Sequence, residues 1–179
     1  MRKCFGIITI VLIIVLCCCM TGCDFIADIS SLMGESNAFK TIIKHIDENS
    51  LYGTDAIFNM TDTCNLIAGY TDDGNTLIFS PYVTTMTTEN KFVLYLAKGE
   101  SKFKWEFTFS EYVMRGEGNR SSFFGTTEKL TYSYTNAPSY LKEGMSTTAA
   151  TNLDLTLTCI NSEFRSLGVT VYDLGFVYY

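Results

Sequence analysis

Histidine chemistry in this chain rests on one residue, because His45 is the only histidine among 179 residues. His45 lies beside Lys44 and Asp47 in a stretch with helical periodicity. A Ser-His-Asp or Cys-His mechanism needs a nucleophile within hydrogen-bonding reach of the base, and that nucleophile would have to come from elsewhere in the chain. We therefore expect His45 to be a structural residue, on a helix surface or partly buried, and we expect no enzyme.

Residues that could bind a metal are equally sparse. Cys64 and Cys159 are separated by 94 residues, which is not the spacing of a zinc site. Asp72-Asp73-Gly74-Asn75 lacks the ligand order of a calcium loop, and Val83 stands where the bidentate glutamate belongs. No glycine-rich stretch continues into the GKS or GKT of a phosphate-binding loop. We expect neither a metal nor a cofactor.

Two carboxylates on neighbouring predicted strands, Glu106 and Glu128, keep hydrolysis open as a remote alternative. Glycoside hydrolases act with a pair of carboxyl groups that flank the scissile bond. Charged side chains on the solvated face of a sheet explain the same two residues. A glycoside hydrolase or other hydrolase is therefore the third hypothesis, behind two kinds of binding.

Tyrosines are more numerous than a core of this size needs. The chain has eleven, including Tyr132, Tyr134, Tyr172, Tyr178 and Tyr179. Tyrosine combines an apolar ring with a polar hydroxyl, which suits interfaces. Tyrosine is also a favoured strand residue, so a purely structural use stays open.

The segment 115–122 is the most loop-like stretch of the chain. It contains glycines and two arginines, and two phenylalanines follow it. Binding residues are often carried on loops that a rigid scaffold positions. The candidate binding residues are therefore Arg115, Arg120, Phe123 and Phe124, although the loop could equally serve only as a connection.

The first 24 residues indicate where the protein is located. Arg2 and Lys3 precede an apolar run from Phe5 to Cys19, which is typical of a secretory signal peptide. Met20-Thr21-Gly22-Cys23 then resembles the lipobox of bacterial lipoproteins. The resemblance implies cleavage before Cys23, lipid chains on the Cys23 thiol and amine, and a protein held at the cell membrane facing outside the cytoplasm.

Two other interpretations of this terminus stay open. The apolar run of about 15 residues could remain as an uncleaved anchor, although a membrane-spanning helix needs roughly 20. Palmitoylation of the cysteines at 17–19 is a second alternative, with Asn59 and Asn119 as glycosylation acceptors.

Removal of residues 1–22 leaves 157 residues, about one domain, and changes the charge balance. Two of the 13 basic residues leave with the signal, so 11 remain against 19 acidic ones, a net charge of about −8. Such a chain is not expected to bind nucleic acid or to dock electrostatically on anionic lipid. Cys64 and Cys159 are then the cysteines left besides Cys23, and they either form a disulfide or remain as two buried thiols.

Periodicity predicts the elements that position these residues. An apolar stripe of Phe39, Ile42, Ile43 and Ile46 predicts a helix from a cap at residues 36–37 to about Asn49. Residues 55–61 are ambiguous, with one helical turn as an option. Strands are expected at 65–70, 76–79, 92–96, 102–112, 128–135 and 169–179, and a second helix at 147–165, where a strand is the alternative.

The expected fold is a two-layer α+β domain over residues 36–179. An antiparallel meander of about five to six strands would carry one N-terminal and one C-terminal amphipathic helix on one face. Residues 23–35 would form the lipidated cysteine and a short tether. Phe103, Trp105, Phe107 and Phe109 share one face of their strand and are expected to build the core.

We therefore expect a membrane-anchored lipoprotein that acts as a non-enzymatic binding module. Its sheet face or its 115–124 loop would bind a protein or an envelope component. The alternative is a carrier of a small hydrophobic ligand, held between the helices and the aromatic strand face.

Overall fold

A computed structural model describes residues 34–50, 53–60, 64–83, 90–120 and 131–176. The chain divides into two units, Met1–Gly34 and Glu35–Tyr179. Gly34 apart, the first unit lies outside the described residues, and so do the predicted signal peptide, the lipidated Cys23 and most of the tether. The strands, the helices and their contacts belong to the second unit.

The second unit is an α+β domain built on a seven-stranded antiparallel sheet. The strands follow one another in space in the order of the chain, so the sheet is a simple meander. Each neighbouring pair is antiparallel. The strands are β1 (Ala56–Asn59), β2 (Cys64–Tyr70), β3 (Thr76–Val83), β4 (Asn90–Ala97), β5 (Lys102–Phe109), β6 (Tyr112–Asn119) and β7 (Thr131–Thr135).

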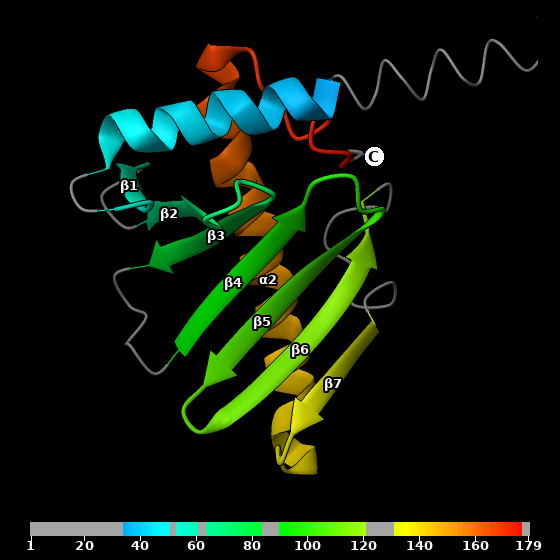
Figure 1. Ribbon diagram of the computed structural model, residues 1–179. Coiled ribbons are helices and arrows are strands. Elements are labelled where there is room, and N and C mark those ends of the chain that lie inside the picture. The colour runs from blue at the N-terminus through cyan, green and yellow to red at the C-terminus, as the bar shows by residue number, and fades with distance from the viewer. Residues whose placement is uncertain (1–33, 51–52, 61–63, 84–89, 121–130, 177–179) are drawn as a thin grey trace, which may run out of the picture. The chain divides into compact units, whose positions relative to one another are not determined.

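Two long helices complete the domain. The N-terminal helix covers residues 34–49, and α2 (Ser139–Phe164) runs behind the sheet in Figure 1. Both helices contribute to one hydrophobic core with the sheet, through Phe39, Ile42 and Ile46 on the first and Leu153, Leu157 and Ile160 on the second. The predicted apolar stripe of the first helix is thus confirmed, as is the two-layer α+β class.

Strand β5 shows how the core is organised. Phe103, Trp105 and Phe107 are buried on the side of α2, while Lys102 and Lys104 are exposed on the opposite side. Successive side chains of a strand point to opposite faces, so this alternation fixes the orientation of the whole sheet. The prediction that the core is built on this strand is confirmed for Phe103, Trp105 and Phe107, but Phe109, at the end of the strand, is 36% exposed.

Strand β6 corrects the prediction of a loop at residues 115–122. Tyr112–Asn119 is a strand within the sheet, paired with β5 on one side and β7 on the other. Trp105 faces Gly116 across the strand pair, and a Cβ on Gly116 would lie 2.2 Å from the Trp105 ring atom Cζ2. The glycine is therefore needed to admit the indole, and it does not mark a turn.

The predicted C-terminal helix is confirmed, but three details of the expected elements differ from the structure. Residues 56–59 form β1, not a helical turn, because Ala56 and Phe58 are buried and alternate with exposed residues as a strand requires. Helix α2 begins at Ser139, well before residue 147, directly after the extended Pro138 at its N-cap. The first helix includes residues 36–37, which therefore do not cap it.

The predicted last strand at 169–179 is also absent from the described part, residues 169–176. These residues form turns after the short helix η2 (Arg165–Leu167). Asp173 accepts hydrogen bonds from the Thr170 amide and hydroxyl, and Gly175 has a φ of +83°. Val171 and Phe176 are nevertheless buried, so the segment closes the core without joining the sheet.

Neither described helix is long and apolar enough to cross a membrane.

Candidate functional site

The face of β4, β5 and β6 opposite α2 gathers every charged residue of these three strands. Figure 1 shows α2 behind the sheet and no described helix in front of these strands. The charged residues of this outer face are Lys91, Lys102, Lys104, Glu106, Arg115 and Glu117. Four are cations and two are carboxylates, so the outer face has a cation excess in an acidic chain.

Cross-strand pairing arranges these groups. Glu106 lies directly opposite Arg115, and the Arg115 Nε donates to Glu106 Oε2 at 2.7 Å. Lys102 forms an ion pair with Glu117. Both pairs are partly solvated and tie β5 to β6, so each contributes about 0.2–1 kcal/mol to stability at most. Their side chains are available for exchange with a partner's groups.

Lys104 differs from its neighbours on the outer face. It stands opposite Tyr95 on one side and Glu117 on the other, yet it makes no ion pair within the described ranges. A shallow hollow of about 460 Å³ includes Lys104, Tyr95, Glu106, Arg115 and Glu117 in its lining. The hollow thus offers an amine and a guanidinium as donors to an anionic group.

The hydroxyl of Tyr95 adds a polar group to the hollow. Partial burial raises the pKa of Tyr95, the charge of Glu106 raises it further, and the charge of Arg115 lowers it. The phenol therefore remains protonated at neutral pH and can donate a hydrogen bond. A second hollow of about 410 Å³ shares Tyr95, Lys104 and Glu117, so the concave surface continues toward β3.

Arg120, a predicted binding residue, is buried at the junction of several elements. Its guanidinium forms an ion pair with Glu35 at the start of the first helix and donates to the carbonyl oxygen of Ala97. Glu35 also accepts a hydrogen bond from the Gly99 amide at 3.1 Å. Gly175 packs closely against the Arg120 side chain. In this arrangement Arg120 holds the domain together and does not face solvent.

The other predicted binding residues have different positions. Arg115 is on the outer face with 59% of its side chain exposed. Phe123 and Phe124 lie outside the described residues, and Arg120 is paired with Glu35 and not placed beside Arg115. The sequence did not single out Tyr95, Lys104 or Glu117, although the alternation of β5 already placed Lys102, Lys104 and Glu106 on one face.

The predicted interface tyrosines are partly used inside the domain. The hydroxyl of Tyr134 bonds the carbonyl oxygen of Lys142 at 2.9 Å and the hydroxyl of Ser146, which ties β7 to α2. Tyr132 stacks edge-on against Tyr134 with ring centroids 5.5 Å apart. Tyr172 is 57% exposed, while Tyr178 and Tyr179 lie outside the described residues.

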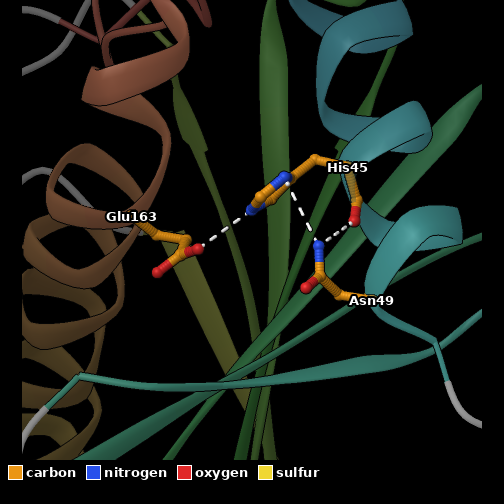
Figure 2. Close-up of polar contacts among 3 residues, drawn as sticks. All are labelled: His45, Asn49 and Glu163. Atoms are coloured by element: carbon orange, nitrogen blue, oxygen red, sulfur yellow. Dashed lines mark hydrogen bonds and ion pairs between the residues drawn. The ribbon is translucent and has the colours of Figure 1, made fainter.

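His45 joins the two helices. Figure 2 shows its ring between Glu163 of α2 and Asn49 of its own helix. Nε2 lies 3.0 Å from Glu163 Oε1, and Nδ1 lies 3.5 Å from Asn49 Nδ2. With Nε2 protonated, the ring donates to Glu163 and can accept from Asn49, so both nitrogens have partners.

The surroundings of His45 favour packing over catalysis. Its ring stacks on Phe58 with centroids 5.0 Å apart, and it meets the edge of Phe164 at 5.7 Å. Among the described residues, the side-chain partners of the ring nitrogens are Glu163 and Asn49, and neither is a hydroxyl or a thiol. The arrangement fits the partly buried structural histidine predicted from the sequence.

The aromatic row of β5 leaves little room for a small ligand. Phe103, Trp105 and Phe107 are each at most 3% exposed. Between the row and the first turns of α2 lies a hollow of about 230 Å³, which Phe107, Phe109 and Met145 help to line. Ligand pockets usually measure about 300–1,000 Å³. The geometry at this place therefore favours a filled core over a carrier cavity.

The remaining chemical candidates are separated or outside the described ranges. Glu106 is engaged with Arg115, and its hypothetical catalytic partner Glu128 lies outside the described residues. Where the structure describes the chain, no group of three His, Cys, Asp or Glu side chains is placed to hold a metal ion. Cys64 and Cys159, in contrast, are brought together in the core.

No known protein family, curated protein sequence or solved structure matches this chain.

Proposed function

We propose that this protein is a membrane-anchored lipoprotein that acts as a non-enzymatic binding module, and that the outer face of β4–β6 binds its partner. The observation that carries the proposal is the composition of the outer face, where β4–β6 carry four cations against two carboxylates in an otherwise acidic chain. The resemblance of Met20-Thr21-Gly22-Cys23 to a lipobox supports the anchor, with lipid on Cys23.

The chemistry of the outer face favours a partner with carboxylate or phosphate groups. Arg115 and Lys104 are exposed cations, and Tyr95 contributes a protonated hydroxyl beside them. Complementary charges speed association and select the correct partner more than they increase affinity. A protein with an acidic segment or an anionic envelope component fits this surface.

The experiment is native mass spectrometry of the full-length protein, extracted gently from its own membranes. The proposal predicts a chain that begins at Cys23, carries lipid mass and retains a second, anionic molecule. A Lys104→Glu variant should keep the lipid and lose the second molecule, while Lys142→Glu on α2 is the control and should retain both.

Three outcomes would change the proposal. Residues 1–22 still present would overturn the lipoprotein assignment. A lipidated chain with a small apolar adduct would favour the carrier. Equal retention of the partner by the Lys104→Glu and wild-type chains would remove the outer face as the binding surface.

A further inference from the structure

Two cysteines far apart in the sequence meet in the core of the domain. Cys64 is the first residue of β2, and Cys159 lies in the C-terminal half of α2. Their sulfur atoms are 3.6 Å apart, and the residues are 8% and 5% exposed. The two thiols are thus in direct contact at the place where the helix packs on the sheet.

The sequence adds an independent observation about the environment of these thiols. After removal of residues 1–22 and lipidation of Cys23, Cys64 and Cys159 are the cysteines that remain in the chain. Disulfides form and persist in oxidising compartments outside the cytoplasm. In such a compartment each of the two thiols has the other as its only possible disulfide partner within the processed chain.

We propose that Cys64 and Cys159 form a disulfide that covalently joins β2 to α2. The proposal rests on the extracytoplasmic location given under the proposed function. In the reaction the two thiols lose two protons and two electrons as the sulfur–sulfur bond forms. A disulfide carrier of the envelope, or a low-molecular-weight disulfide, accepts them and is released as two thiols.

The burial of the pair determines when this bond can form. Burial and the contact with Cys64 raise the pKa of Cys159 to about 12. The thiolate is the form that attacks a disulfide, so folded protein exchanges poorly at neutral pH. Because both residues are also buried, oxidation occurs while the exported chain folds, before α2 closes over β2, and the same burial shields the finished bond from reductants.

The bond would enclose the proposed binding surface. The 94 residues between the two cysteines contain β3 to β7 and most of α2. The first helix and β1 precede the loop in the sequence.

The test uses the full-length chain extracted from its own membranes and alkylated in denaturant without reductant. The inference predicts that the peptides carrying Cys64 and Cys159 are found as one linked species that reductant separates. Alkyl groups on both cysteines, in chains that begin at Cys23, would overturn it.

A second outcome distinguishes a failure of the disulfide inference from a failure of the proposed location. Chains that still begin at Met1 with both thiols alkylated would overturn the proposed cleavage and lipidation at Cys23. The full chain, refolded with oxidised glutathione, then decides the cysteine inference: a linked 64–159 peptide supports it. Glutathione adducts or alkylated thiols in place of the link overturn it.

Thermal unfolding gives a second readout. Reductant added to the unfolded wild-type chain before refolding should lower Tm by about 10 °C, since closing a loop of this length strongly restricts the unfolded chain. The matched control is the Cys64→Ala/Cys159→Ala double variant, whose Tm should not respond to reductant. An equal response of the two proteins would overturn the inference.

Discussion

Arg115 and Arg120 lie five residues apart and were equally good binding candidates in the sequence, yet they belong to different regions of the molecule. The Arg115 side chain is 59% exposed on the outer face and pairs with Glu106. The Arg120 side chain is 7% exposed and pairs with Glu35, which is 14% exposed. The same residue type therefore serves a solvated surface in one case and a buried junction in the other.

The difference follows from position along β6 and not from residue chemistry. Arg115 is in the middle of the strand, where the alternation of side chains turns it away from α2. Arg120 directly follows the strand, where its amide donates to the carbonyl oxygen of Ser101, its guanidinium pairs with Glu35 of the first helix, and Gly175 packs against its aliphatic carbons. Arg115 can exchange Glu106 for an anionic group of a partner, whereas Arg120 must remain paired with Glu35.

The largest expected effect comes from removing Arg120, the buried member of the two arginines. Arg120→Ala leaves the Glu35 carboxylate buried without its cation and should lower the free energy of unfolding by about 3–5 kcal/mol. Arg115→Ala is the matched control and should lower it by about 1 kcal/mol or less. Urea unfolding of both variants measures the two values, and equal losses would contradict the assignment of Arg120 to a buried junction.

A smaller effect is expected from filling the space at Gly116, on the buried face of β6. Gly116→Ala places a methyl group against the Trp105 indole and should cost about 1–3 kcal/mol of unfolding free energy. The control is Gly144→Ala in α2, where a Cβ meets no atom within 4 Å, and helix propensity should add about 0.5–1 kcal/mol. Thermal unfolding should therefore show a lower Tm for Gly116→Ala and a higher Tm for Gly144→Ala than for the wild-type protein. A neutral Gly116→Ala would mean that the indole is not packed as described.

The smallest effect concerns the electrostatics of the outer face. The pKa of Tyr95 is raised in the folded state, so folding favours the protonated phenol. The stability gained from this preference is complete below about pH 10 and is lost as the pH rises above that value. Glu106→Gln should lower the Tyr95 pKa and Arg115→Ala should raise it. Absorbance titration of tyrosinate, with Tyr95→Phe as the blank, measures both shifts. Shifts of the opposite sign would contradict the arrangement of the hollow.

Much of the fold could be predicted because periodicity reports directly on burial. The stripe of Phe39, Ile42 and Ile46 predicted the first helix, and the alternation along β5 predicted both its buried and its outer face. Gly74, in the turn between β2 and β3, has a φ of +67°, as the Asp-Gly turn implied. Such signals are local, so a single sequence is enough to detect them.

The errors arose where a residue's role depends on a distant neighbour. The glycines of β6 suggested a loop because nothing within the strand reveals that Gly116 faces Trp105. Arg120 resembled a surface residue because Glu35 lies 85 positions away. The hollow was missed for the same reason, since the register that places Tyr95 beside Lys104 and Glu117 is a property of the assembled sheet.

The measurement that most directly tests the binding face is site-specific photo-crosslinking of the full-length protein in its own membranes. A photoreactive residue at Ser133, which stands opposite Arg115 on β7, is compared with one at Thr151 on the exposed side of α2. The proposal predicts a crosslinked partner from Ser133 and not from Thr151. The Lys104→Glu/Arg115→Glu charge reversal should reduce its yield about tenfold, the effect of losing about 1.4 kcal/mol of binding free energy. A partner captured only from Thr151, or a yield unaffected by the charge reversal, would contradict the outer face as the binding surface.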